Sequence, residues 1–174
     1  GIHVTTEEIL ITSGSGQGIE LINEILLDEG DTVIVESFTF AGALSNLRRR
    51  GVNFVGVDVD ESGIRMDHLK DILEDLKTNG IRPKYIYTIP TLQNPTGTVM
   101  TMDRRYQLLK LGEEYEVPIF EDECYADLIF EGEYEKAIRS LDDSNRVLHI
   151  GSFSKSLGPG LRLGYVVASW DVMS

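Results

Sequence analysis

Cysteine is nearly absent from this sequence of 174 residues, which contains only Cys124. A single cysteine excludes both a disulfide within the chain and a metal site built from several cysteines. Histidine is also scarce, and His3, His68 and His149 lie too far apart in the sequence to show the spacing of metal ligands. We therefore predict no metal site. No apolar run approaches the roughly 20 residues that a membrane-spanning helix needs, so no contact with a membrane is expected.

Basic residues are outnumbered by acidic ones, 16 against 29, which gives a net charge of −13. Nucleic acids and anionic membranes require clustered positive charge, so this balance argues against both as partners. Hydrophobic residues make up 41% of the chain and charged residues 26%, which suits one globular domain with a sizeable core. The lone cysteine, together with the lack of a signal-peptide pattern after Gly1, favours a cytoplasmic location.

Short apolar segments alternate with helical patterns along the chain. The segments are rich in β-branched and aromatic residues, which is typical of strands buried on both faces of a mostly parallel sheet. They cover residues 32–36, 52–57, 85–89, 117–120, 147–150 and 163–168. Between them, apolar residues recur at helical spacing, as in Leu69, Ile72, Leu73 and Leu76. The alternation predicts a layered α/β domain with right-handed crossovers.

Ligands of open α/β sheets bind at the carboxyl ends of the strands, so the residues that follow each strand are the candidates for a site. The first such loop, Thr12 to Gly18, is rich in glycine and leads into a helix. It suits a phosphate, although a structural glycine turn explains it equally well. Phe38 and Phe40 follow the strand that ends at Glu36. They could cap a flat ring, but aromatic residues more often belong to the core.

Three later strand ends carry further polar residues. Asn94 lies in an irregular turn with two prolines, where it forms the turn or donates to a ligand. The carboxylates at 121–123 precede Tyr125 and are expected to lie partly in a solvated loop, with little support for a metal. Lys155 lies among serines, and Arg162 follows a Gly-Pro-Gly turn, although a surface lysine is the ordinary alternative.

The residues at the strand ends indicate a ligand more specifically when they are considered together. One sheet would present an anion-binding helix start, an aromatic plate, an amide, a carboxylate with a tyrosine, and a lysine followed by an arginine. These are the parts that bind pyridoxal phosphate: a phosphate cradle, a ring stack, donors to the ring oxygen, a carboxylate for the pyridine nitrogen, and a lysine that captures the aldehyde.

The sequence resembles the fold-type-I pyridoxal-phosphate enzymes, specifically the class I/II aminotransferases. The resemblance rests on the segments TSGSGQG, SFTFAG, NPTG, EDECY and SFSKSLGPGLRLGY, in the order of the family, from Thr12 to Tyr165. It implies a three-layer α/β/α sandwich around a mostly parallel, seven-stranded sheet with one antiparallel strand. The wording of the last two segments is most similar to the branch that handles 2-aminoadipate, aromatic amino acids and kynurenine.

The resemblance also implies roles for individual residues. Lys155 would form the Schiff base with the cofactor and later move the α-proton, and Asp122 would keep the pyridine nitrogen protonated. Asn94 and Tyr125 would hydrogen-bond the ring oxygen, and Phe40 would stack on the ring. The phosphate would be held by Ser15, Gly16 and Gln17 on one side, and by Ser152, Ser154 and Arg162 on the other.

Two positions depart from the family pattern without removing a reactive group. Cys124 stands where the family often has a proline before the tyrosine, and Gly16 stands where close relatives often carry a larger polar residue. The implied reaction is a ping-pong transamination between an amino acid and a 2-oxo acid, with both as small-molecule partners. The resemblance further implies a homodimer, since such sites are shared between subunits.

The length of the chain suggests part of a longer protein. The family's subunit is about twice as long, so residues 1–174 are interpreted as the large cofactor-binding domain, without the N-terminal segment and the C-terminal small domain. On that interpretation the isolated chain binds the cofactor weakly, transaminates poorly, and exposes apolar helix faces.

Three alternatives to an aminotransferase stay open at the level of the sequence. The chain could be the ligand-sensing domain of a transcription regulator that carries an aminotransferase-like domain. It could be a lyase or synthase of the same fold, which differs mainly in the residues that grip the substrate. It could also be a nucleotide-binding α/β domain without covalent chemistry, in which case Lys155→Ala leaves ligand binding intact.

Overall fold

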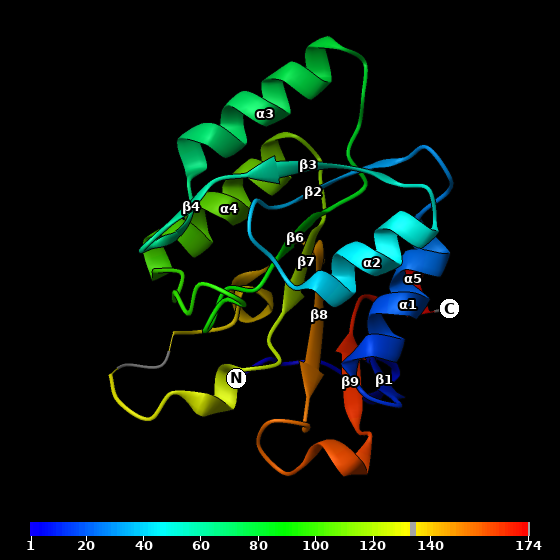
Figure 1. Ribbon diagram of the computed structural model, residues 1–174, viewed down its shortest axis with the longest axis vertical. Helices are drawn as coiled ribbons and strands as arrows, with labels where there is room; N and C mark the ends of the chain where they lie inside the picture. Colours follow the sequence, from blue (N-terminus) through cyan, green and yellow to red (C-terminus); the bar gives the residue numbers. More distant parts are fainter. Residues whose placement is uncertain (133–134, 174) are drawn as a thin grey trace.

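A seven-stranded sheet forms the middle of the molecule (Figure 1). The computed structural model describes residues 1–132 and 135–173. The strand order across the sheet is β1-β9-β8-β7-β6-β2-β3. The strands comprise β1 (Ile9–Thr12), β2 (Thr32–Glu36), β3 (Asn53–Val57), β6 (Ile86–Thr88), β7 (Ile119–Asp122), β8 (Val147–Ser152) and β9 (Gly164–Val167). β9 runs antiparallel to both of its neighbours, whereas the other pairings are parallel.

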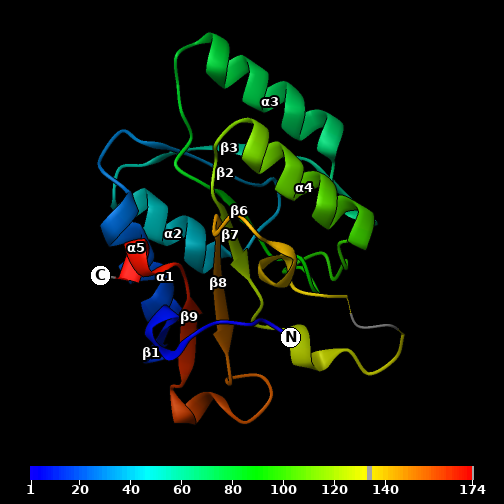
Figure 2. The same ribbon diagram turned by 180° about the vertical axis from the view of Figure 1, so that it is seen from behind.

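Helices cover both faces of this sheet (Figures 1 and 2). On one face lie α1 (Ser15–Leu26), α2 (Ala41–Arg49) and α5 (Trp170–Met173), and their apolar side chains form one core with alternate residues of the strands. On the other face lie α3 (Met66–Thr78) and α4 (Met102–Glu114), which form a second core. The predicted three-layer α/β/α sandwich with one antiparallel strand is confirmed.

The chemistry of the residues explains why these elements form. All five residues of β2 (TVIVE) are buried, as expected for a strand with helices on both faces. In α3, the predicted stripe of Leu69, Ile72, Leu73 and Leu76 is buried against the sheet. In α4, Leu108 and Gly112 lie four residues apart on one side of the helix and are buried.

Several boundaries differ from the sequence-based expectation. β7 and β8 continue to Asp122 and Ser152, beyond the predicted ends at Phe120 and Ile150. β2 has the predicted bounds, whereas β3, β6 and β9 are shorter than their apolar runs, because hydrophobicity marks burial and does not require ladder hydrogen bonds. A small hairpin of β4 (Val59–Asp60) and β5 (Gly63–Ile64) was not predicted. Neither were the 3₁₀ turns η1 (Thr6–Glu8), η2 (Ala126–Leu128), η3 (Ile138–Leu141) and η4 (Pro159–Leu161).

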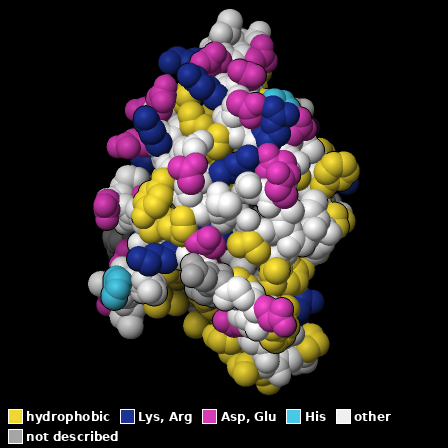
Figure 3. Space-filling view, turned by 90° about the vertical axis from the view of Figure 1, so that its left-hand side faces the viewer, with side chains coloured by type: hydrophobic (Ala, Val, Ile, Leu, Met, Phe, Trp, Pro, Cys, Tyr) yellow, Lys and Arg dark blue, Asp and Glu magenta, His cyan; other side chains and the backbone are white. Residues whose placement is uncertain are grey.

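Large exposed apolar side chains concentrate on an edge strand and on loops. Figure 3 shows hydrophobic side chains gathered at the lower end of the molecule, where Figure 1 draws the loop between β8 and β9. Leu157 and Leu161 of this loop are 68% and 61% exposed, and Ile11 of β1 is 63% exposed. On the helices, Ile25 and Tyr106 are exposed in the same way. Among the described residues, no helix combines the length and the apolar character needed to cross a membrane.

Candidate functional site

A cavity of about 310 Å³ opens at the carboxyl end of the sheet, beside the first turn of α1. Its wall includes nine of the residues predicted for the site: Ser15, Gly16, Phe40, Asp122, Tyr125, Ser152, Ser154, Lys155 and Arg162. Gln17 and Asn94 are not part of this wall, and Ile89, Cys124 and Pro159 complete it. The volume lies in the range that small ligands occupy in proteins.

The first turn of α1 and Arg162 form an anion-binding corner of the cavity. The N-cap residue Gly14 has no side chain to cap the free amides, and the first turn contains no acidic residue. Gly14 has φ +77°, and a Cβ atom there would lie 2.5 Å from the Arg162 guanidinium. Only glycine therefore allows Arg162 to approach the loop, where its Nη2 donates to the carbonyl of Ser13 at 3.2 Å.

Gln17 stabilises the loop that forms this corner. Its Oε1 accepts a hydrogen bond from the backbone amide of Ser13 at 2.6 Å, which closes the loop onto the first turn of α1. Across the corner, Ser152 Oγ accepts from the amide of Ser154 at 3.1 Å, at the point where β8 ends. The side chain of Gln17 thus orders the loop, and the predicted contact of Gln17 to a phosphate stays a prediction.

Asp122 is the buried acid of the cavity, with only 4% of its surface exposed. Side chains alternate along β7, so Asp122 lies on the same face as Phe120, toward α1 and α2. Its Oδ2 accepts a 2.6 Å hydrogen bond from the Tyr87 hydroxyl, and its Oδ1 accepts from the amide of Cys124 at 3.3 Å. Burial raises the pKa of Asp122 above its usual value. A cationic ligand group beside it would restore the charged form.

Lys155 and Tyr125 lie close together in the cavity wall, and Asn94 contacts Tyr125. The Lys155 ammonium nitrogen lies 5.9 Å from the centroid of the Tyr125 ring. The Tyr125 hydroxyl accepts a hydrogen bond from Asn94 Nδ2 at 2.9 Å. Asn94 therefore reaches the site through Tyr125, and both could donate to the same ligand oxygen.

Phe40 lines the cavity at the start of α2. A side chain at Gly42 would collide with the Phe40 ring, so glycine at 42 leaves the room that this ring occupies. Phe40 remains 38% exposed, which leaves apolar ring surface available to a flat ligand.

Tyr87 is a contact of the site that the sequence analysis missed. It lies in the predicted strand 85–89, and its buried hydroxyl contacts Asp122 from the neighbouring strand β6. The pKa of Tyr87 is raised well above its usual value, chiefly by burial, so the hydroxyl remains a donor. A tyrosine near the end of a buried strand, next to the strand that carries the acid, was the available signal.

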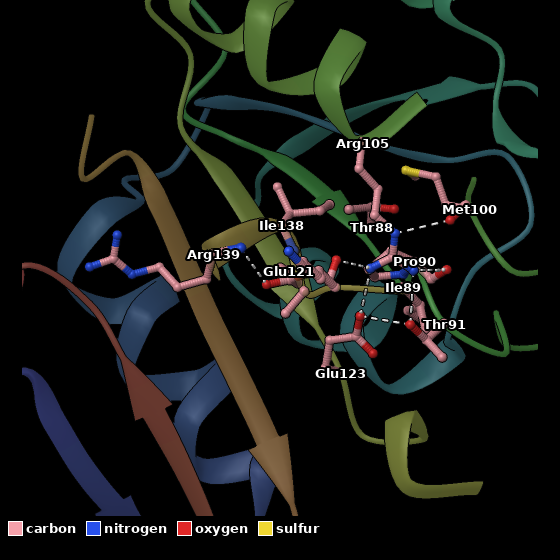
Figure 4. Close-up of polar contacts among 12 residues, drawn as sticks. Thr88, Ile89, Pro90, Thr91, Met100, Arg105, Glu121, Glu123, Ile138 and Arg139 are labelled. Atoms are coloured by element: carbon pink, nitrogen blue, oxygen red, sulfur yellow. Dashed lines mark hydrogen bonds and ion pairs between the residues drawn. The ribbon is translucent and has the colours of Figure 1, made fainter. Parts of the chain in front are cut away.

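The other carboxylates of this segment lie on the opposite face of the sheet (Figure 4). The prediction of a partly solvated loop at 121–123 was wrong, because Glu121 and Glu123 are both buried. Glu121 Oε2 lies 2.8 Å from His149 Nδ1 and accepts from the amide of Arg139 at 3.0 Å. Glu123 Oε1 accepts from Arg105 at 3.2 Å and from the Thr91 hydroxyl at 2.8 Å.

Arg105 lies at the centre of the hydrogen bonds around Glu123, and its side chain is fully buried (Figure 4). All five of its N–H groups have acceptors. Besides Glu123, these acceptors are the Thr91 hydroxyl and the carbonyls of Met100, Pro90 and Lys136. The guanidinium therefore holds both ends of the 90–100 segment against β7.

A larger cavity of about 410 Å³ lies on this second face, lined in part by His149, Glu123, Tyr165 and Ile9. His149 already contacts Glu121, and Glu123 already accepts from Arg105 and Thr91. The smaller cavity instead combines Lys155 and Arg162 with a buried acid, so we take it as the candidate site despite its size.

Comparison with known proteins gives the family. The model of the aminotransferase class I and II family matches residues 1–174. An uncharacterized aminotransferase of Saccharolobus solfataricus is 42% identical over 97% of the chain, and aromatic-amino-acid aminotransferase 1 of Thermococcus litoralis is 38% identical over 96%. The chain belongs to the class I and II aminotransferase family.

Solved structures agree with this assignment. Kynurenine aminotransferase of Pyrococcus horikoshii, solved in complex with PMP, matches with a TM-score of 0.94 and 38% identity over 98% of the chain. An uncharacterized HTH-type transcriptional regulator of Bacillus subtilis, YisV, is also similar, at 33% identity over 99% of the chain. The chain spans about two fifths of the length of the Saccharolobus and Thermococcus aminotransferases, 42% and 40%, and 34% of the length of the regulator.

Proposed function

We propose that this chain binds pyridoxal phosphate in the 310 Å³ cavity and serves transamination between an amino acid and a 2-oxo acid. The observation that carries the proposal is that the groups this chemistry needs all line one cavity. Lys155, the buried carboxyl of Asp122 and the anion-binding corner of α1 with Arg162 all line it. We also propose that residues 1–174 form the large cofactor-binding domain of a longer subunit, as the share of the relatives' length supports.

The donor set fits this cofactor group by group. A phosphate dianion suits the uncapped amides of α1, the hydroxyls of Ser15 and Ser152, and the Arg162 guanidinium. A protonated pyridine nitrogen suits Asp122, because burial raises the pKa of this carboxyl and a cation beside it would favour the charged form. The similarity to a kynurenine aminotransferase in complex with PMP, the aminated form of this cofactor, is consistent with the fit.

Each residue has a separable task in the proposed site. When bound, the cofactor supplies an electron-withdrawing ring that stabilises charge developing on the substrate α-carbon. The Lys155 amine would hold the cofactor through its aldehyde, with loss of water, and would carry the α-proton. The Asp122 carboxylate keeps a proton on the ring nitrogen, and the Tyr125 and Asn94 pair donates to the ring oxygen. Phe40 covers one ring face and helps to exclude water.

Three finer statements belong to the same proposal. The substrates are taken from the branch named above, aromatic amino acids, kynurenine or 2-aminoadipate, as the names of the similar proteins suggest. The assembly is a homodimer, which the exposed apolar residues Ile11, Leu157 and Leu161 support. The location is the cytoplasm, as the lone free cysteine favours.

The second candidate function is a ligand-sensing domain of a transcription regulator. The similarity to the HTH-type regulator YisV over 99% of the chain favours it. Both candidates predict cofactor binding at Lys155. They differ in whether an added amino acid is converted to its 2-oxo acid.

Reduction of the bound cofactor with borohydride tests the proposal. The 174-residue chain with pyridoxal phosphate should develop a visible absorbance band, and mass spectrometry after reduction should find the label on Lys155. Lys110→Ala, which changes an exposed lysine of α4, is the matched control and should keep the band that Lys155→Ala loses. A label on another lysine contradicts the proposed site.

A single-turnover assay with a stoichiometric amino acid, run on the longer subunit proposed above, then separates the two candidates. Release of one equivalent of 2-oxo acid supports transamination. Binding at Lys155 without any release of 2-oxo acid supports the ligand-sensing domain.

A further inference from the structure

Glu36 is a buried carboxylate to which the sequence analysis gave no role. It is the last residue of β2, and only 2% of its surface is exposed. Its Oε1 accepts hydrogen bonds from the Thr88 hydroxyl at 2.6 Å and the Ile89 amide at 3.1 Å. Its Oε2 accepts from Gln93 Nε2 at 2.7 Å and the Thr39 hydroxyl at 3.3 Å.

These donors belong to the segments that carry the candidate site. Ile89 lines the cavity, and Thr39 and Gln93 directly precede Phe40 and Asn94. Glu36 therefore contacts two loops that follow different strands, β2 and β6. One buried group links the residue proposed to cover the ring with the residue proposed to bind its oxygen.

Gln93 completes the link with both ends of its amide. Besides Glu36, its Nε2 donates to the carbonyl of Phe38. Its Oε1 accepts from the amide and the hydroxyl of Thr96, at 2.9 and 2.8 Å. The Gln93 amide cannot be turned over without losing these contacts, so its N–H groups stay directed at Glu36 and Phe38.

A carboxylate is the side chain that fits this environment. An N–H donor approaches each of its oxygens, Ile89 on one side and Gln93 on the other. An amide at position 36 would direct its own NH₂ at one of these donors in either orientation, which leaves a buried donor unpaired. These hydrogen bonds therefore require a carboxylate at position 36 and an amide at position 93.

We propose that Glu36 and Gln93 are positioning residues that hold the 38–40 and 93–97 segments, and through them Phe40 and Asn94, in the geometry that binds the cofactor ring. This inference rests on the proposed function. Neither residue lines the cavity, so both act through their neighbours.

An exchange of the two side chains tests this proposal at pH 8, above the pKa of about 7 that burial gives Glu36. Glu36→Gln alone and Gln93→Glu alone should each raise the Kd for pyridoxal phosphate by about tenfold, since each mismatches a buried hydrogen bond to a charged group. The double variant Glu36→Gln/Gln93→Glu should recover part of this affinity, because an amide again faces a carboxylate, whereas the hydrogen bond to the Phe38 carbonyl stays lost.

Binding of inorganic phosphate distinguishes a positioning role from a general structural defect, because a general defect would weaken phosphate binding as well. Phosphate competes for the anion-binding corner, which Glu36 and Gln93 do not contact, so its inhibition constant should stay unchanged in all three variants. Glu20→Gln, an exposed acid of α1, is the matched control and should bind both ligands as the wild type does.

The possible outcomes separate this inference from the proposed function. Wild-type affinity in Glu36→Gln, or a parallel loss of phosphate and cofactor binding, would overturn the positioning role. An exchange variant that recovers nothing would overturn it as well, even where one single variant is poorly folded. A wild-type chain that binds no cofactor at all would instead contradict the proposed function.

Discussion

Buried acids occur on both faces of the sheet at its carboxyl end, and the two faces treat them differently. On the face of α1 and α2, Asp122 lines a cavity together with Lys155 and Arg162. On the face of α3 and α4, Glu36, Glu121 and Glu123 accept hydrogen bonds from the protein itself. The first arrangement leaves charged groups for a ligand, whereas the second uses them to hold loops.

Strand β7 makes this contrast especially clear, because it contributes to both faces within three residues. Alternation of side chains sends Asp122 toward the cavity and its neighbours Glu121 and Glu123 away from it. The same residue type at adjacent positions therefore has opposite tasks. Burial alone does not distinguish a ligand-binding acid from a structural one; the number and source of the donors do.

The largest effect is expected from breaking the closed face at Arg105. Arg105→Met leaves Glu123 buried without its cationic partner, which should lower the free energy of unfolding by about 3–5 kcal/mol. Urea denaturation measures this loss. Arg82→Met is the matched control, since the Arg82–Glu116 ion pair is exposed and should contribute less than about 1 kcal/mol. Equal losses in both variants would contradict the role of the buried network.

The second effect concerns pH and Glu36. Because burial raises its pKa in the folded chain from 4.5 to about 7, the folded state holds this proton more tightly than the unfolded state. The contribution of Glu36 to the free energy of unfolding is fully present at low pH and is lost as the pH rises through about 5 to 8. The wild type should therefore lose roughly 3 kcal/mol relative to Glu36→Gln over this window. Parallel pH profiles of the two proteins would show that Glu36 titrates normally.

The third effect belongs to the open face. Arg162→Ala should weaken binding of pyridoxal phosphate by about 10- to 100-fold, since it removes a charge-assisted contact to the phosphate. Binding of pyridoxal, which lacks the phosphate, should be unchanged and serves as the internal control. An equal loss for both ligands would place Arg162 outside the anion-binding corner.

Much of the fold could be predicted because it depends on patterns that survive in a single sequence. Buried strands with β-branched residues and the stripe of α3 gave the layers, and the family resemblance added the antiparallel strand β9. The exact strand ends could not be predicted. Ile89 and Val117 are as apolar as their neighbours, but β6 ends before Ile89 and β7 begins after Val117.

The residues of the site also divide into those that could be predicted from the sequence and those that could not. Residues that line the cavity lie in the motifs, so Lys155, Asp122 and Arg162 could be proposed from the sequence. Tyr87 and Glu36 were missed, because their contacts come from neighbouring strands and distant segments, and a position near a strand end does not by itself reveal those contacts. The burial of Glu121 and Glu123 was missed for the same reason, since Glu123 contacts Arg105 of α4, and Glu121 contacts His149 of β8 and the amide of Arg139.

A paired measurement on Asp122→Asn and Glu121→Gln tests the central claim most directly. We predict that Asp122→Asn weakens pyridoxal phosphate binding by at least about tenfold and leaves the Tm unchanged or higher, because the buried acid has few donors of its own. Glu121→Gln should lower the Tm by about 4–8 °C through lost hydrogen bonds and keep the cofactor affinity. The reverse pattern, with cofactor affinity lost in Glu121→Gln and stability lost in Asp122→Asn, would contradict the division of tasks between the two faces.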